Sequence, residues 1–254
     1  MRHFFTILSH EIRMLLVSPG TYVAAVLFLA LMGFVFSSVV EVYTTGAQDA
    51  PPAATFFQLF WLPVFFMVPL LTMKCLAEER RLGTLETLLT APVTATEVVL
   101  GKFGATYGLY LGLWGATGGY FWVLHHYDRN PMLVDPASLA GGYLFIAISG
   151  LLFVALGVLA SSLTKNQAVA ATMNFVLLLL LVWGPRVALN HLALLNAPAL
   201  QPVRAALDYM LVFRHLEDFT RGLVDTRELL YYMSGAGLAL VFSVFSVEAK
   251  QIHS

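Results

Sequence analysis

The sequence predicts an all-α membrane protein with six transmembrane helices. Two observations predict this fold class. Hydrophobic residues make up 59% of the 254 residues and charged residues only 11%, a composition far more apolar than that of a soluble domain. The few charges also leave long stretches without Asp, Glu, Lys or Arg. Because a helix of about 20 apolar residues crosses the roughly 30 Å hydrocarbon core of a bilayer, such stretches are candidate spans.

Six charge-free runs are long enough to cross a membrane. They cover residues 14–40, 50–73, 103–127, 136–164, 166–185 and 229–247. A seventh gap, 187–203, contains several polar residues and prolines, so we expect it to be re-entrant or interfacial. Pro63 and Pro69 are expected to kink the second span. Without internal repeats or linkers, residues 1–254 are predicted to form one transmembrane domain.

The segment 2–17 precedes the first span and is predicted to be an interfacial helix. Its apolar and polar residues lie on opposite helical faces, with Phe5, Leu8, Ile12 and Leu15 on one and Arg2, Thr6, Ser9 and Arg13 on the other. Glu11 interrupts the segment, which is therefore not expected to be a cleavable signal peptide. The Ser18-Pro19-Gly20 sequence should end the helix before the first span.

The distribution of positive charge predicts the orientation. Six spans place both termini on one side, and eight of the 14 Lys and Arg fall on that side: Arg2, Arg13, Lys74, Arg80, Arg81, Lys102, Lys165 and Lys250. Because Lys and Arg near span ends favour the cytoplasmic side, we expect both termini in the cytoplasm.

Two helix starts carry capping signals. The sequence from Thr94 to Glu97 is a capping box flanked by Val93 and Val98, so the third spanning helix should begin near Ala95. The sequence from Asp225 to Glu228 repeats this device before the last span.

Several function classes are excluded or disfavoured. A net charge of -1 gives no basic field for nucleic acid, and the single Cys75 allows no internal disulfide. The runs contain no Asp, Glu, Lys or Arg, which disfavours an ion-coupled transporter. The sequence has no P-loop, H-E-x-x-H or G-x-S-x-G motif, so neither ATP binding nor catalysis is expected in this chain. His125 and His126 could contact a metal, but adjacent histidines point to different helical faces, and we interpret them as interfacial.

Five glycines form a stripe on one face of the third span. They are Gly104, Gly108, Gly112, Gly115 and Gly119. In lipid, a glycine face lets another helix approach closely, so we expect this span to pack deep in the bundle or at a subunit seam. A substrate groove is the less favoured alternative.

The segment 78–103 combines a dense set of charges with a leucine ridge. Leu82, Leu85, Leu88 and Leu89 lie on one side of a short predicted helix over 83–91 that ends before Pro92. Such a helix either floats among the lipid headgroups or docks in a groove of another protein.

This segment resembles the cytoplasmic motif of type-2 ATP-binding-cassette (ABC-2) permeases. The motif elements, in order, are Glu78-Glu79-Arg80-Arg81, Gly83-Thr84, Glu86, Leu88-Leu89, Pro92-Val93 and Gly101-Lys102. The far part of the chain is similar to the subgroup that includes the gliding-motility permease GldF and the permease NosY. The residues that match are His215, Phe219, Arg221, Gly222, Asp225, Arg227, Glu228, Tyr231 and Tyr232, with a departure over residues 214–218.

The resemblance implies a permease subunit of an ATP-driven, exporter-type transporter in the bacterial inner membrane. It implies six spans, a coupling helix at 83–91 and short re-entrant helices within an outer segment, 186–228. Two permease subunits, identical copies or paralogues, would pair above two cytoplasmic ABC ATPase subunits, which hold ATP and Mg. Contacts to the ATPase would come from Glu78, Glu79, Arg80, Arg81, Gly83, Thr84, Leu85, Glu86, Leu88, Leu89 and Pro92. The alternative is a membrane scaffold or assembly factor without transport activity.

Overall fold

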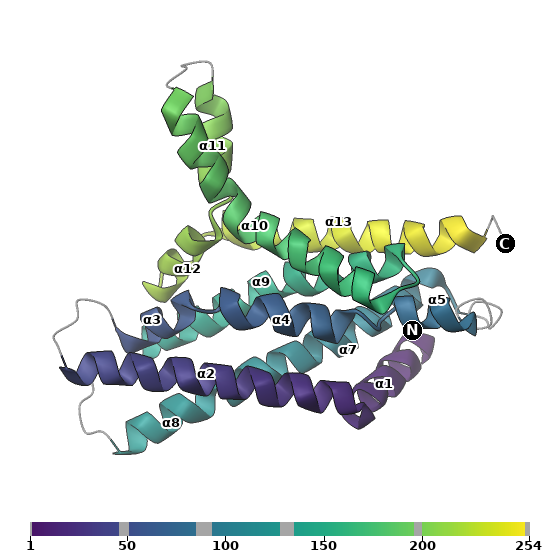
Figure 1. Ribbon diagram of the computed structural model, residues 1–254, viewed down its shortest axis with the longest axis horizontal. Coiled ribbons are helices and arrows are strands. Elements are labelled where there is room, and N and C mark those ends of the chain that lie inside the picture. The colour runs from purple at the N-terminus through teal and green to yellow at the C-terminus, as the bar shows by residue number, and fades with distance from the viewer. Residues whose placement is uncertain (1, 46–50, 85–92, 128–134, 196–199, 252–254) are drawn as a thin grey trace.

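The computed structural model describes residues 2–45, 51–84, 93–127, 135–195 and 200–251, and the regular elements within them are α-helices (Figure 1). They are α1 (Arg2–Val17), α2 (Pro19–Thr45), α3 (Pro52–Gln58), α4 (Trp61–Thr72), α5 (Ala77–Leu82), α7 (Ala95–Ala116), α8 (Gly118–Tyr127), α9 (Pro136–Leu163), α10 (Gln167–Leu195), α11 (Gln201–Tyr209), α12 (Val212–Thr220) and α13 (Thr226–Gln251). The all-helical prediction is therefore confirmed for these residues.

Five of the described helical stretches are long and apolar enough to cross a membrane. They are Pro19–Tyr43, Trp61–Leu82, Pro136–Leu163, Gln167–His191 and Thr226–Ala249. The third predicted span is instead divided between α7 and α8, with Thr117 between them. Neither α7 nor α8 is among the five candidate spans. The structure thus confirms a multi-pass helical membrane protein, and the sixth span stays a prediction.

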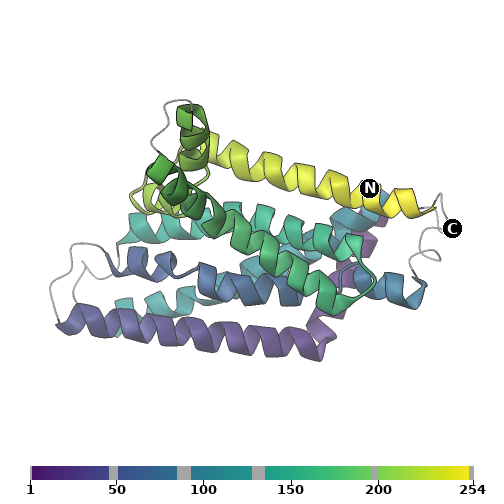
Figure 2. The ribbon, with the colours of Figure 1, turned by 45° about the horizontal axis from the view of Figure 1, so that its top comes forward.

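The helices run between two ends of an elongated bundle (Figures 1 and 2). One end, the termini end, holds both chain termini, α5, the start of α7 and the turn between α9 and α10. The other, the far end, holds α3, α8 and α12 (Figure 1). The predicted placement of both termini on one side agrees with this arrangement.

Two prolines mark departures from straight, uninterrupted spans. The second predicted span is divided into α3 and α4 at Leu59 and Phe60, just before Pro63, whose ring lacks the N–H that would bond the Leu59 carbonyl. The charge-free run of the fifth predicted span stops at Pro185, but α10 continues through this proline to Leu195, because one missing backbone hydrogen bond does not end the helix. The re-entrant or interfacial placement of residues 187–203 stays a prediction.

The centre of the bundle is α9, which packs against α13, α10, α7, α12 and α4. Large aromatic side chains fill the space around it, including Phe57, Tyr110 and Phe145, each with no exposed surface. Glycines on α9 make this packing possible. A Cβ atom at Gly142 would overlap the Phe57 ring, and one at Gly150 would overlap the Tyr110 ring.

The predicted glycine stripe runs from α7 to the start of α8 and is largely open in this chain. Gly104 faces α1, where an added Cβ would lie 3.2 Å from Leu8 Cδ1. Added Cβ atoms would meet no described atom within 4 Å at the other four positions, Gly108, Gly112, Gly115 and Gly119. No described part of this chain therefore packs closely on these four glycines, and packing at a subunit seam stays a prediction.

The outer segment contains two short helices, α11 and α12, before α13. Their re-entrant placement stays a prediction. Helix α11 packs against α10, and α12 packs against α9 and α3. Helix α12 ends at Thr220, and two residues later Gly222 has a φ of +79°, a left-handed conformation that favours glycine. There the amide of Leu223 donates to the carbonyl of Asp218 at 2.9 Å, which closes the helix end.

Candidate functional site

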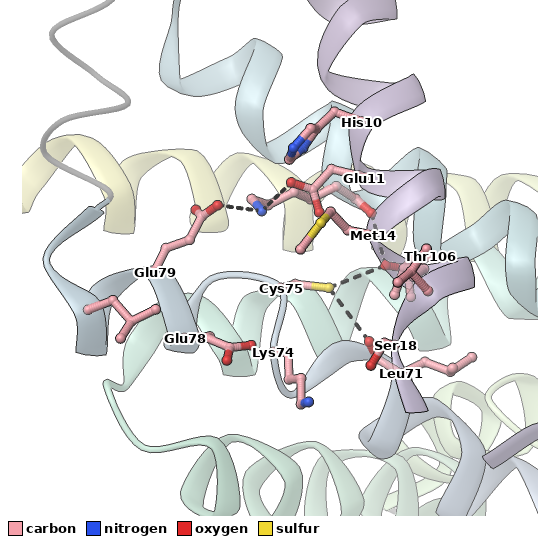
Figure 3. Close-up of a pocket in the computed structure, with 14 residues that line it drawn as sticks. His10, Glu11, Met14, Ser18, Leu71, Lys74, Cys75, Glu78, Glu79 and Thr106 are labelled. Carbon is pink, nitrogen blue, oxygen red and sulfur yellow. Dashed lines mark hydrogen bonds and ion pairs between the residues drawn. The ribbon is translucent and has the colours of Figure 1, made fainter. Parts of the chain in front are cut away.

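A buried lysine joins three helices at the termini end. Lys102 Nζ lies 2.7 Å from Glu11 Oε1 on α1 and 2.8 Å from Glu79 Oε1 on α5, and its side chain is only 4% exposed. Dashed lines mark these ion pairs in Figure 3. We call Glu11, Lys102 and Glu79 the charge triad. Because a buried ammonium needs partners that replace its lost hydration, both carboxylates are required neighbours.

Local sequence signals position the lysine. Thr94 caps α7: its Oγ1 accepts from the Glu97 amide, and the Glu97 carboxylate accepts from the Thr94 amide, each at 3.2 Å. This confirms the predicted capping box and the start at Ala95. Two turns later, Gly101 lets α1 approach, since an added Cβ would lie 2.7 Å from Ile7 Cγ2. The glycine and the cap thereby place Lys102 directly against α1.

Helix α5 is held to α9 by a serine. Ser161 Oγ accepts hydrogen bonds from the amides of Leu76 and Ala77, each at 3.0 Å, and donates to the Met73 carbonyl at 3.2 Å. These amides begin α5 and have no partner within the helix. Ser161 is fully buried. The bonds therefore fix the start of α5 on the central helix.

Arg80 ties α5 to the last helix. Its Nη2 donates to the Ser246 carbonyl on α13 at 2.9 Å, and Ser246 Oγ donates to the Ser162 carbonyl on α9 at 3.0 Å. Arg80 is 7% exposed, and its remaining nitrogens, Nε and Nη1, have no hydrogen-bond partner in the described structure. The guanidinium of Arg80 therefore points inward and anchors the helix, and its contact with an ATPase stays a prediction.

The other predicted coupling residues divide into surface and internal positions. Glu79 belongs to the charge triad, whereas Glu78 and Arg81 form a partly exposed pair at 3.9 Å, which adds little stability. Gly83 ends α5 with a φ of +72°, a conformation that glycine adopts without strain. Thr84 follows it. The predicted residues Leu85, Glu86, Leu88, Leu89 and Pro92 lie outside the described residues.

A cavity of about 430 Å³ lies beside the charge triad, between α1, the α4–α5 segment and α7 (Figure 3). Its wall carries Lys74, Glu78 and the triad residues, together with apolar side chains such as Met14 and Leu71. It is therefore amphipathic, with charged and hydrophobic walls in one space.

A second polar cluster lies at the far end, around His215. The Nε2 atom lies 2.9 Å from the Tyr209 carbonyl, which can only accept, so Nε2 carries the proton and Nδ1 accepts from Tyr232 Oη at 3.0 Å. Burial lowers the pKa of the His215 imidazole below its ordinary value of 6.5. The buried ring therefore prefers the neutral form.

The remaining predicted outer residues serve the ends of helices. Phe219 is fully buried, and its carbonyl approaches Gly141 so closely that a Cβ there would overlap it. Asp225 Oδ1 accepts from the Arg227 amide at 2.9 Å at the start of α13. Arg221 is exposed. These residues build the far end of the bundle.

The sequence pattern did not identify four residues that hold the site together: Glu11, Lys102, Ser161 and Ser246. Lys102 appeared only as part of the Gly-Lys motif. Its signal was that it is the one basic residue on a helix that is otherwise apolar after its first turn. Glu11, the only acidic residue in segment 2–17, offered a similar signal.

The fold and the site define a multi-pass helical membrane protein whose charged residues gather at one end of the bundle. Residues 53–205, more than half of the chain, match the ABC-2 family transporter protein family. The chain belongs to this family, and it is therefore a permease subunit of an ABC transporter, a class that works with an ABC ATPase. No curated protein matches the chain significantly.

Proposed function

We propose that this permease, of the GldF/NosY-like subgroup, is an exporter-type subunit driven by ATP hydrolysis in a separate ATPase dimer. It would pair with a second copy or a paralogue in the bacterial inner membrane, with both termini in the cytoplasm. The chain itself would bind no ATP or Mg and carry out no covalent chemistry. The coupling contact would be the segment between α5 and α7, residues 83–91.

The observation that carries this proposal is that the helices on both sides of this segment, α5 and α7, are bonded to the rest of the bundle. On one side, α5 is bonded to α9 through Ser161, to α13 through Arg80, and to α1 and α7 through Glu79 and the charge triad. On the other side, the Thr94 cap fixes the start of α7. A displacement of residues 83–91 therefore acts on helices throughout the bundle.

The mechanism follows from this connectivity. Closure of the ATPases on ATP would move the coupling segment as a rigid body, and α5 and α7 would follow because their ends are bonded rather than loose. Glu79 and Glu11 both hold Lys102, so α1 would move with them. The permease thereby converts a cytoplasmic motion into a rearrangement of its membrane helices.

Site-specific cross-linking tests the contact. A photo-cross-linking amino acid at Leu82, 62% exposed at the end of α5, should capture an ABC ATPase subunit in membranes. Leu223 is the matched control, because it is 63% exposed but lies at the far end. Capture at Leu223, or none at Leu82 in membranes that contain the co-expressed ATPase, contradicts the proposed coupling end.

The predicted leucine ridge gives a second test. Replacing Leu88 and Leu89 with Asp puts charge where apolar anchoring is expected. Because a buried unpaired carboxylate costs several kcal/mol and 1.4 kcal/mol is tenfold in affinity, ATPase co-purification should fall at least about a hundredfold. Membrane levels of the variant should be normal. If no ATPase co-purifies with the unmodified protein in mild detergent, the scaffold alternative is favoured.

A further inference from the structure

The cavity beside the charge triad continues into the membrane-spanning part of the bundle. A smaller cavity of about 220 Å³ lies between α2 and α4, and the two cavities share Leu15, Ser18, Leu71 and Lys74 in their walls. The smaller one is lined mainly by apolar residues. Val23 and Leu70 at its wall are 59% and 40% exposed on two candidate spans, so this part opens toward lipid.

The cavity beside the charge triad also contains Lys74, a positive charge without a counterion among the described residues. Lys74 is exposed, and no ion pair to it is found among the described residues. Its Nζ lies over the first turn of α2, since a Cβ at Gly20 would be 3.9 Å from Nζ and 3.7 Å from Ser18 Oγ. The positive end of a long helix and an ammonium group repel each other. An anion at this point would relieve that repulsion.

Three glutamates, Glu11, Glu78 and Glu79, also line this cavity. Lys102 pairs with one oxygen of Glu11 and one of Glu79. The other oxygen of Glu79, Oε2, is buried and accepts no hydrogen bond from any described group. Among the described residues, the only ion pair of Glu78 is the 3.9 Å pair with Arg81. A buried carboxylate oxygen without a donor is costly. A hydrogen-bonding cation at this side would supply the missing donors.

We propose that the two cavities together bind one zwitterionic glycerophospholipid with a primary ammonium headgroup. Its phosphate lies beside Lys74 and Ser18 at the start of α2, its ammonium lies beside Glu78 and Glu79, and one acyl chain enters the smaller cavity. The volume of about 430 Å³ corresponds to about 14 water molecules at roughly 30 Å³ each, which is room for such a headgroup.

The position of the cavity favours a lipid over a soluble phosphate compound. It lies at the corner between the amphipathic helix α1 and the apolar helix α2, where headgroups meet acyl chains. The apolar extension would be left empty by a soluble ligand. A lipid held here would contact α1, α2 and α5, and α5 is the helix that leads into the proposed coupling segment.

Native mass spectrometry on the purified full-length permease tests the proposal. Phosphatidylethanolamine, phosphatidylcholine and phosphatidylglycerol with identical acyl chains are offered at equal concentration. Phosphatidylethanolamine should bind about tenfold better than phosphatidylcholine, whose methylated ammonium cannot donate hydrogen bonds. Inorganic phosphate and glycerophosphoethanolamine should not displace it. Equal binding of the three lipids, preference for phosphatidylglycerol, or displacement by either soluble compound overturns the proposal.

Two variants locate the site. Lys74→Gln and Glu78→Gln should each remove the preference for phosphatidylethanolamine, while Lys165→Gln and Glu248→Gln, exposed residues at the same end outside the cavity, should retain it. Thermal unfolding of each variant without lipid checks that the bundle is intact. A preference that survives both cavity variants, or that is lost equally in the controls, places the lipid elsewhere and overturns the assignment.

Discussion

The two ends of the bundle are held together by different interactions. At the termini end, charged side chains from α1, α5 and α7 form ion pairs around the buried Lys102, and a cavity lies beside them. At the far end, the ion pair between Arg214 and Asp208 is exposed, α12 is packed on α9 through Phe219 and Gly141, and His215 makes neutral hydrogen bonds at both ring nitrogens. Buried polar atoms without a described partner occur at both ends, such as Arg80 Nε and Glu228 Oε2.

This difference matters for motion. Ion pairs that bridge helices can be exchanged for others when helices move, whereas an interlocked aromatic and glycine contact has one packed arrangement. The termini end therefore has the properties of a segment that changes conformation, and the far end those of a fixed frame. The predictions below test this contrast, from the largest expected effect to the smallest.

Removing the central cation of the triad should have the largest effect. Lys102→Met leaves Glu11 and Glu79 facing an apolar side chain with no counterion, which should lower the stability by about 3–5 kcal/mol. Thermal unfolding in detergent measures this loss. The triple variant Glu11→Gln, Lys102→Met and Glu79→Gln removes the charges together and should recover most of it. If the triple variant is no more stable than Lys102→Met, charge imbalance is not the cause.

The sequence predicted the existence of the helices of this fold better than the residues at which they begin and end. Charge-free runs are a local property of the chain, because a charge in the hydrocarbon core is costly wherever the helix packs, and the described helices follow the runs closely. The break at Thr117 and the continuation through Pro185 depend on which neighbours pack there. Periodicity alone carries no information about those neighbours.

The candidate site was predictable only in part, for a related reason. The Thr94 cap lies within four residues and could be recognised, whereas Glu11 and Lys102 are 91 residues apart in the chain. The glycine stripe suggested close packing, but of its five positions only Gly104 would bring an added Cβ within 4 Å of a described neighbouring helix, and the tightest contacts are at glycines of α9. The spacing of residues in the sequence shows which of them share a face of a helix, but it does not show which face a neighbouring helix covers.

At the far end, adding a single methyl group tests the fixed frame. Gly141→Ala places a Cβ where the Phe219 carbonyl lies, so α12 must shift, at a cost of about 1–3 kcal/mol. Gly237→Ala on α13 is the control, because its Cβ would meet no described atom within 4 Å, and it should be neutral or slightly stabilising. Equal melting temperatures for the two variants would show that α12 is not locked onto α9.

Acid should loosen the far end through His215. The pKa of its imidazole is lowered by burial, so the unfolded chain binds a proton more readily than the folded one. Stability is therefore unchanged above the ordinary value of 6.5 and falls as the pH drops below it. The His215→Gln variant cannot titrate there and should lose this part of the pH dependence. Melting curves from pH 8 to pH 5 that are parallel for the two proteins would contradict the assignment.

The smallest effect on stability is expected from the open glycines of α7, and it tests the seam that the sequence suggested. A leucine at Gly108 or Gly112 would project into an apolar groove of about 310 Å³ between α1 and α7. The free energy of unfolding of the single chain should therefore change by less than about 0.5 kcal/mol, as measured by thermal unfolding. Gly104→Leu is the contrasting variant, because it meets Leu8 on α1 and should destabilise. If a second permease subunit packs on the stripe, Gly108→Leu and Gly112→Leu should reduce the dimer captured by cross-linking in membranes although the single chain stays folded. An unchanged dimer yield would mean that these glycines face lipid, and the seam would then lie on another face of the bundle.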